Sequence, residues 1–163
     1  MALEIRLATN NDIAAASSIL IEAAHWLAQT GELRWRPEKF SPDLLEPLVD
    51  SGELHLSFRD NKAVGTMYLQ LEDQAFWSDV PKSESLFIHK LAVSLDARGS
   101  GVSQALIEFA KLEVRRRKRN YLRLDCRDEP NLRALYENAG FELRDIGEFF
   151  NTKFCRYEIK IRE

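Results

Sequence analysis

The residues between positions 86 and 103 have the types and spacing needed to bind a phosphate group. An apolar run over residues 86–93 leads through a short polar link to Arg98, Gly99, Ser100, Gly101, Val102 and Ser103, where an amphipathic segment begins. Glycines permit positive φ and let the backbone approach a phosphate without an intervening Cβ. The first N–H groups of a helix lack partners within the helix and attract anions. This stretch therefore predicts a phosphate-bearing cofactor.

The turn does not have the features of the common nucleotide-binding loops. No Lys-Ser or Lys-Thr pair follows Gly101, as a Walker A loop requires, and the three-glycine dinucleotide pattern is missing. Two nearby glycines also occur in tight turns between a strand and a helix that bind nothing. Taken alone, the turn leaves both interpretations open.

The elements that must position this turn follow from the spacing of apolar residues. Strands are expected at residues 4–8, 53–59, 63–72, 86–93, 121–126, 141–146 and 154–161, and helices at 13–29, 42–51, 99–118 and 130–138. Residues 86–126 form a strand–helix–strand unit, whose strands should be parallel. We expect one α/β (α+β) domain over residues 1–163, with a mixed, mostly antiparallel sheet of about seven strands and helices on both faces.

Composition excludes several classes of protein. The chain has 163 residues, is 45% apolar and 30% charged, and carries a net charge of −3, so no general positive field favours nucleic acid or membranes. No apolar run has the length of a membrane span, and the charged residues Glu4 and Arg6 argue against a signal peptide. Cys126 and Cys155 are too few for a disulfide framework and lack metal-ligand spacing. We expect a cytoplasmic protein with reduced cysteines, no metal and no membrane or nucleic-acid partner.

Two motifs in the expected order resemble those of the GNAT family of N-acetyltransferases. In that family a strand ending in a Leu-Ala-Val-like sequence is followed by Gln/Arg-x-x-Gly-x-Gly/Ala, and here Leu91, Ala92 and Val93 precede the turn at Arg98. The segment 132–141, with Tyr136, Gly140 and Phe141, is similar to the family's Tyr-Glu-x-x-Gly-Phe motif. The two motifs cover residues 86–141. The resemblance implies a GNAT-like fold with a splayed pair of parallel strands.

The resemblance also implies acetyl-CoA as the cofactor. The backbone of Leu91, Ala92 and Val93 would bind the pantetheine arm, and the N–H groups of residues 98–103 would hold the pyrophosphate. A backbone N–H near Val93 would polarise the acetyl carbonyl. Ser103 replaces the usual final Gly or Ala of the motif. The family often has a cofactor-contacting asparagine where this chain has Glu129, and Asn131 lies two residues later.

Tyr136 is the first catalytic candidate, as a general acid that protonates the departing thiolate of CoA. The alternative is a tyrosine that only packs in the core or against the cofactor. His89 is the candidate base, because some family members use a His or Glu on this strand to deprotonate the amine. Adjacent strand residues face opposite sides of a sheet. If the side chain of His89 faces the substrate it can act as the base, and if it faces the other side its role is structural. Glu84 and Glu72 are weaker candidates for the base.

Aromatic residues fall in or beside the expected loops: Trp26, Trp35, Phe76, Trp77, Phe149 and Phe150. Trp35 with Arg34 and Arg36 could form an acceptor pocket, although ordinary loop packing is slightly preferred. The basic run at residues 115–119 lies at a helix C-terminus, where cations complement the dipole. That placement is preferred to an RNA-binding patch.

These observations predict an N-acetyltransferase that transfers an acetyl group directly to a primary amine of a small molecule or peptide. The alternative is a non-catalytic GNAT-fold module that binds CoA or acyl-CoA as a sensor or partner-binding domain. A third reading, an RNA-associated protein, is less favoured. Homodimers are common in the family, and the sequence leaves the acceptor amine open.

Overall fold

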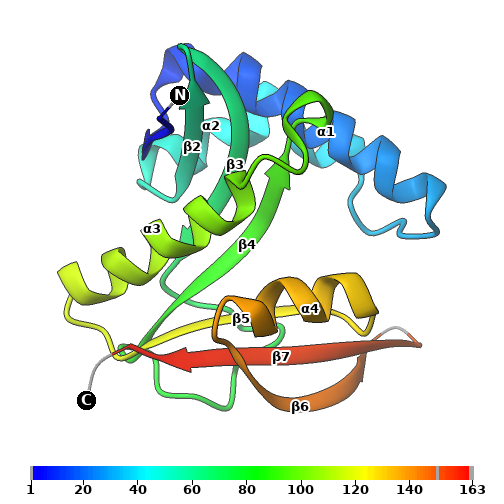
Figure 1. Cartoon of the computed structure of the whole chain (residues 1–163), viewed down its shortest axis with the longest axis vertical. Helices are drawn as coiled ribbons and strands as arrows, with labels where there is room; N and C mark the ends of the chain where they lie inside the picture. Colours follow the sequence, from blue (N-terminus) through cyan, green and yellow to red (C-terminus); the bar gives the residue numbers. More distant parts are fainter. Residues whose placement is uncertain (1, 150, 162–163) are drawn as a thin grey trace. The chain divides into compact units, whose positions relative to one another are not determined.

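The structure is a computed structural model that describes residues 2–149 and 151–161. Within these residues seven strands form one mixed sheet, in the order β1-β2-β3-β4-β5-β7-β6 (Figure 1). The strands are β1 (Glu4–Leu7), β2 (Leu54–Arg59), β3 (Lys62–Gln70), β4 (Ser85–Val93), β5 (Tyr121–Arg127), β6 (Glu142–Phe149) and β7 (Thr152–Lys160). The α-helices are α1 (Ile13–Gln29), α2 (Pro42–Asp50), α3 (Val102–Arg116) and α4 (Pro130–Asn138).

The strand pairing confirms the mixed sheet expected from the sequence. Strands β1 and β2, β2 and β3, β5 and β7, and β6 and β7 pair antiparallel. Strands β4 and β5 pair parallel from Ser85↔Tyr121 to Phe87↔Arg123, and the register between them ends there although both strands continue. These strands are the parallel pair that the expected fold requires.

Contacts divide the chain into two compact units, each described by itself. The first unit contains the described residues up to Leu69 together with residues 90–106, and the second contains residues 70–89 and the described residues from Ile107 onward. The first unit carries the glycine turn, and the second carries His89 and Tyr136.

In the first unit, helices lie on both faces of β2 and β3. Leu54 and Leu56 of β2 share one buried core with Leu20 of α1 and Leu45 of α2. On the opposite face Gly65 makes room for α3, since a Cβ added there would lie 2.6 Å from Ser57 Oγ and 2.8 Å from Val102 Cγ1. Close packing of α3 against β3 fixes where that helix begins.

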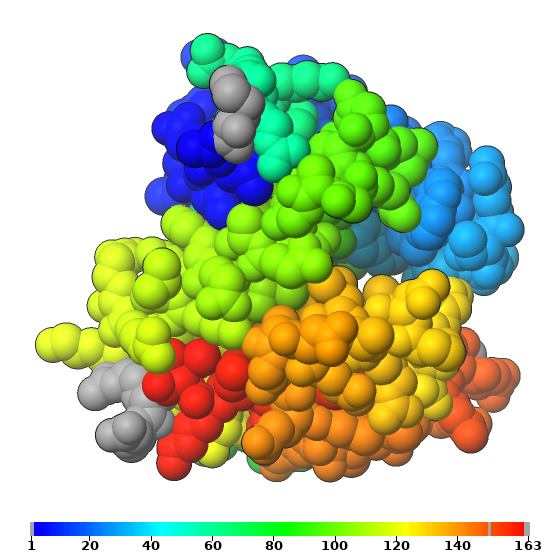
Figure 2. All heavy atoms as spheres, viewed as in Figure 1, coloured from blue at the N-terminus to red at the C-terminus, as the bar shows by residue number. Residues whose placement is uncertain are grey.

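In the second unit, α4 and the loop at residues 71–84 cover opposite faces of β7. Tyr157 contacts α4 through a hydrogen bond of 3.1 Å from Arg133, whereas its neighbour Arg156 donates to Phe76 O in the loop at 3.0 Å. Adjacent strand residues face opposite sides, so these contacts identify the two faces. Figure 2 shows α4, in yellow and orange, over the middle of β7, whose red atoms emerge on either side.

The element bounds follow the sequence expectations, with two informative differences. Helices α1 and α4 have the predicted bounds, but α3 begins at Val102 rather than Gly99. Gly99 (φ +75°) and Gly101 (φ +86°) are left-handed, which is incompatible with the start of a helix. Strands β6 and β7 extend into the expected connection at residues 147–152, of which Phe150 lies outside the described residues. Nowhere in residues 2–149 and 151–161 is a helix both long and apolar enough to cross a membrane.

Candidate functional site

The turn at residues 98–103 adopts the backbone conformation that its glycines were expected to permit. Gly99 and Gly101 both have positive φ, and a Cβ added at either would meet no atom within 4 Å. The glycines are therefore needed for their backbone conformation rather than for lack of space. Ala105 N donates to Gly101 O at 3.1 Å as α3 begins. The first N–H groups of α3 thus follow directly after an exposed turn, where they can donate hydrogen bonds to an anion.

Two arginines place positive charge at this turn. The Arg98 guanidinium lies 3.8 Å from the centre of the Trp26 ring, a cation–π contact with α1. Arg59, at the end of β2, donates from Nη1 to Ser100 Oγ at 2.9 Å. The sequence placed Arg98 at this turn for its backbone N–H group, but nothing in the sequence signals the contact of Arg59 across 41 positions.

The strand segment before the turn contains a backbone irregularity at Lys90. This residue has a φ of +51°, in the left-handed region that costs a non-glycine residue about 1–2 kcal/mol. Its carbonyl oxygen accepts a hydrogen bond from Thr66 Oγ1 at 3.0 Å. Beyond it, Ala92 is buried in the core of the first unit, while Leu91 and Val93 are half-buried. Leu91 and Val93 thus lie in the strand directly after the left-handed Lys90.

His89 lies on the loop face of the second unit. Ser85 and Phe87, which alternate with it along β4, contact Arg123 and Trp77 on that face. His89 Nε2 lies 3.1 Å from Asp73 Oδ2, and Asp125 of β5 contributes a third group, with atoms of all three within 4.8 Å of one another. One nitrogen and two carboxylates could together bind a metal ion, but the same set also suits proton transfer.

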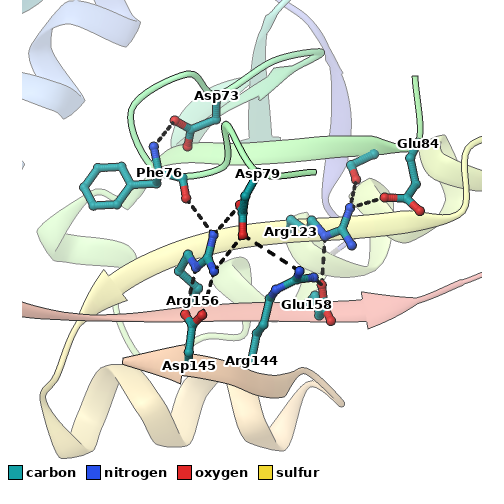
Figure 3. Close-up of polar contacts among 10 residues, drawn as sticks. Asp73, Phe76, Asp79, Glu84, Arg123, Arg144, Asp145, Arg156 and Glu158 are labelled. Carbon is teal, nitrogen blue, oxygen red and sulfur yellow. Dashed lines mark hydrogen bonds and ion pairs between the residues drawn. The ribbon is translucent and has the colours of Figure 1, made fainter. Parts of the chain in front are cut away.

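Asp73 is the most buried member of this cluster, with a side chain 4% exposed against 22% for His89. Its Oδ1 accepts a hydrogen bond from Phe76 N at 3.0 Å (Figure 3). Burial acts to raise the pKa of Asp73, but the contact with His89 and the backbone N–H groups of Phe76 and Ala75 bring that pKa below its ordinary value. Asp73 is therefore a carboxylate at neutral pH. In the sequence, Asp73 is only the residue that follows the strand expected at 63–72.

Tyr136 is buried on the α4 side of the second unit, with 7% of its surface exposed. Its ring makes an edge contact with Phe141 at a centroid distance of 5.9 Å. Burial raises the pKa of the phenol, and Cys126 and Asp125 raise it further. Tyr136 is therefore protonated throughout the neutral range, which a general acid requires.

Glu129 stands at the position where the family often has a cofactor-contacting asparagine. Glu129 precedes the first turn of α4 as its N-cap, and its carboxylate pairs closely with Arg127 Nη2. Asn131 lies exposed in the first turn of α4. Of the two residues, Asn131 has the more accessible side chain.

The loop that carries Asp73 is held to the sheet by two arginines (Figure 3). Arg156 Nη1 lies 2.7 Å from Asp79 Oδ1 and Nη2 lies 2.6 Å from Asp145 Oδ2. Arg123 is 3% exposed and lies 2.6 Å from Glu84 and 2.8 Å from Glu158. Glu84, a weaker candidate for the base, is thus part of a structural ion pair. The other, Glu72, is half-exposed and lies 3.6 Å from Lys82.

The aromatic residues singled out by the sequence have separate partners. Trp35 packs against Phe40 with ring centres 5.8 Å apart. Its neighbours Arg34 and Arg36 pair with Glu32 and Glu38.

The loop aromatics of the second unit pack into its interior. Trp77 is 2% exposed, and the ring centre of Phe76 lies 4.8 Å from that of Phe149 and 5.2 Å from that of Phe154. Phe150 lies outside the described residues. Loop packing therefore accounts for Phe76 and Trp77.

The cysteines and the basic run are engaged within the second unit. Cys126 and Cys155 are register partners on the antiparallel strands β5 and β7, and burial raises the pKa of Cys126 to about 12.

In the basic run at residues 115–119, Arg116 and Arg117 pair with Glu113. Arg119 donates to two backbone carbonyls, those of Lys82 and Ser85. These contacts favour a structural role for the basic residues.

Comparison with known proteins gives a consistent result. Residues 50–143, more than half of the chain, match the family described as acetyltransferase (GNAT) domain. A Bacillus subtilis protein named uncharacterized N-acetyltransferase YesJ is 24% identical over 142 residues, which cover 83% of this chain and 79% of that protein.

Solved structures have the same fold. A GNAT-family acetyltransferase from Listeria monocytogenes matches with a TM-score of 0.78 at 22% identity, covering 97% of this chain and 94% of that one. The PaiA N-acetyltransferase of Thermoplasma acidophilum, solved in complex with coenzyme A, matches with a TM-score of 0.79 at 16% identity, covering 98% and 99%.

Proposed function

This chain belongs to the GNAT family of acetyltransferases, and we propose that it transfers an acetyl group directly from acetyl-CoA to a primary amine of a small molecule or peptide. The observation that carries this proposal is the left-handed conformation of Gly99 and Gly101 at the start of α3. An anion-binding turn at this position is what a pyrophosphate-bearing acyl donor needs. The PaiA structure, whose fold this chain shares, contains coenzyme A.

The cofactor-binding residues follow from the first unit and from the family motif. The N–H groups of residues 98–103 bind the pyrophosphate, and Arg98 and Arg59 supply positive charge beside it. The backbone of residues 91–93 binds the pantetheine arm in the manner of a neighbouring strand. Asn131 contributes a polar contact from α4.

The proposed reaction is a direct attack without a covalent enzyme intermediate. The neutral amine nitrogen attacks the thioester carbon, and a backbone N–H near Val93 stabilises the oxyanion that forms. His89 takes the proton released from the nitrogen. The C–S bond then breaks, and Tyr136 donates its phenolic proton to the departing sulfur. His89 loses its proton to solvent and Tyr136 regains one, so the products are the amide and CoA.

Tyr136 suits this role because burial keeps its phenol protonated, as the pKa above its ordinary value indicates. His89 suits the complementary role because an imidazole can accept a proton near neutral pH. We further propose that residues 1–163 act as a single acetyltransferase domain in the cytoplasm.

Thermal unfolding with added ligands tests the cofactor. Acetyl-CoA at one hundred times its dissociation constant should stabilise the protein by about 2.7 kcal/mol, which for a chain of this size is a rise in Tm of about 5–10 °C. NAD and ATP should not raise it. The Arg98→Ala variant should lose much of the shift, while Arg115→Ala, an exposed arginine at the end of α3, should keep it. An unchanged Tm with acetyl-CoA would contradict the assignment.

Release of free thiol during incubation with acetyl-CoA and a panel of amines tests turnover. We expect CoA release that depends on the amine and a product with the mass of the acetylated amine. Binding of acetyl-CoA without thiol release for any amine would favour a non-catalytic acyl-CoA sensor.

A further inference from the structure

The buried Asp73 and the half-buried His89 form an acid–imidazole pair that the family motifs do not include. Given the acetyl transfer proposed above, on which this inference rests, we propose that Asp73 is a positioning residue that orients His89 to take the proton from the acceptor amine. Asp73 would not touch the substrate. It acts through His89, from the loop that follows β3.

The geometry of the pair determines which imidazole nitrogen is available. His89 Nε2 is the imidazole nitrogen next to Asp73, 3.1 Å from Oδ2, and in the orientation we propose it carries the hydrogen that faces the carboxylate. The lone pair is then on Nδ1, which becomes the atom that accepts the proton of the amine. A carboxylate that fixes the tautomer of a histidine in this way is a recurring arrangement in enzymes that transfer protons.

A positive charge on His89 would stabilise the buried carboxylate of Asp73. The side chain of Asp73 is 4% exposed, and its Oδ2 has no hydrogen-bond partner among the described residues. The contact with His89 has the length of a hydrogen bond but is not aligned as one. A buried anionic oxygen without a hydrogen bond is costly, and a positive imidazolium at this distance offsets the cost. The pair therefore becomes more favourable when His89 has taken the proton.

Asp73 is itself fixed in place by the loop. Its Oδ1 accepts from Phe76 N at 3.0 Å, and Arg156 binds Phe76 O at 3.0 Å from β7 (Figure 3). The pKa of Asp73 below its ordinary value keeps the carboxylate ionised. A rigid, ionised carboxylate is what orientation of an imidazole requires.

The other charged groups on this face either belong to the cluster or have partners elsewhere. Asp125 of β5 has a carboxylate oxygen within 4.8 Å of the other two groups and adds a second negative charge. Arg123 is bound by Glu84 and Glu158. Arg156 is bound by Asp79 and Asp145. Neither of these arginines is paired with Asp73 or Asp125, the two carboxylates that lie near His89.

The first test compares Asp73→Asn with Asp79→Asn in amine acetylation. An asparagine at 73 can still accept from Phe76 N but has no charge, and Asp79 is a carboxylate of the same loop that pairs with Arg156 instead. We expect Asp73→Asn to lower kcat about 10- to 100-fold, with the KM for acetyl-CoA unchanged. Asp79→Asn should leave both kcat and this KM unchanged.

The second test combines Asp73→Asn with His89→Gln. If Asp73 acts through His89, the double variant should be no slower than His89→Gln alone, whereas independent roles would multiply. NMR of the imidazole signals adds a readout that needs no substrate. The chain has three histidines, so His89→Gln identifies the signal. In Asp73→Asn the ring-nitrogen shifts of the His89 signal should change, because the imidazole has lost the carboxylate that fixes its tautomer. All measurements include a chelator, because the cluster could bind a stray cation.

The outcomes separate this inference from the proposed function. If the unmodified protein acetylates amines and Asp73→Asn behaves like Asp79→Asn, the positioning role is wrong and the acetyltransferase stands. The double variant could also have a kcat below that of His89→Gln by the same factor that Asp73→Asn alone causes. That result would show that Asp73 does not act through His89 and would overturn the positioning role. If acetyl-CoA binds but no amine is acetylated, the proposed function fails, and with no proton to transfer the positioning role fails with it.

Discussion

At the residue scale, burial determines which side chains can exchange protons. The phenol of Tyr136 has a raised pKa because it is buried, so Tyr136 stays protonated over the range in which an amine becomes a nucleophile. The thiol of Cys126 is held protonated by the same cause. By contrast, the burial of Asp73 is outweighed by His89 and two backbone donors. Similar burial therefore leaves a phenol neutral and a carboxylate charged.

Tyr136→Phe tests the general acid. We expect kcat to fall about 100-fold, within the usual range for loss of an acid catalyst, with little change in Tm because the ring and its contact with Phe141 remain. Thiol release at saturating acetyl-CoA and amine measures this. Tyr121→Phe, a half-buried tyrosine at the start of β5, serves as the control. Unchanged kcat in Tyr136→Phe would assign the residue to packing only.

The buried Arg123 is predicted to contribute strongly to the free energy of unfolding. Its guanidinium is 3% exposed and lies between Glu84 and Glu158. Arg123→Met would leave Glu84 without this cation and Glu158 with only the more exposed Arg144, which costs about 3 kcal/mol. Chemical denaturation measures the loss. Arg144→Met removes a more exposed arginine, 33% exposed, from the same Glu158, and should cost about 1 kcal/mol or less. Equal losses in the two variants would contradict this account.

At the element scale, the site depends on where α3 and β4 change direction. Helix α3 begins at Val102, after two left-handed glycines, and packs against β3 at Gly65. Strand β4 carries the left-handed Lys90, whose carbonyl is held by Thr66. These irregular positions, rather than the regular parts of the strands and helices, determine where backbone N–H groups and side chains point.

Gly65→Ala tests the packing of α3. The new Cβ would lie 2.6 Å from Ser57 Oγ, so the helix or the strand must shift, at a cost of about 1–3 kcal/mol. Gly147→Ala is the matched control, because a Cβ at this position of β6 meets nothing within 4 Å. Thermal unfolding should show a clear loss for Gly65→Ala and almost none for Gly147→Ala. A stable Gly65→Ala protein would mean that α3 accommodates the methyl group.

The elements could be predicted from sequence because their signals are local. The spacing of apolar residues gave α1, and Pro130 with Gly140 gave the bounds of α4. The positive φ of Lys90 has no local signal, because no glycine or asparagine marks it, and it depends on a hydrogen bond from Thr66 on another strand. The face occupied by His89 and the role of Asp73 depend on contacts across many positions, so strand parity alone could not predict them.

At the scale of the whole molecule, several carboxylates are held ionised by arginines in both units. The pKa of Asp12 is lowered by its hydrogen bond with Arg6, and those of Asp79 and Asp145 are lowered by hydrogen bonds with Arg156. A carboxyl whose pKa is lower in the folded state stabilises the fold above its unfolded pKa, and this contribution is lost as pH falls through the folded value. The charge pattern therefore predicts a fold that weakens in acid.

Thermal unfolding between pH 3 and pH 7 checks this expectation. We expect Tm to be nearly constant above about pH 5 and to fall below about pH 4, near the ordinary pKa of aspartate. Return to neutral pH should restore the original Tm. A Tm that rises with acidification would contradict the ion-pair account.

The end of the β4–β5 register at Phe87 and Arg123 has a consequence for deuterium exchange. Within the described residues, Leu124–Arg127 of β5 pair with β7 but not with β4. Amides pointing away from β7 in this segment should take up deuterium within seconds, while those paired with β7 resist. If acetyl-CoA binds beside these amides, their exchange should slow on binding. The exchange rates of individual β5 amides, measured with and without acetyl-CoA, would then show where the cofactor lies.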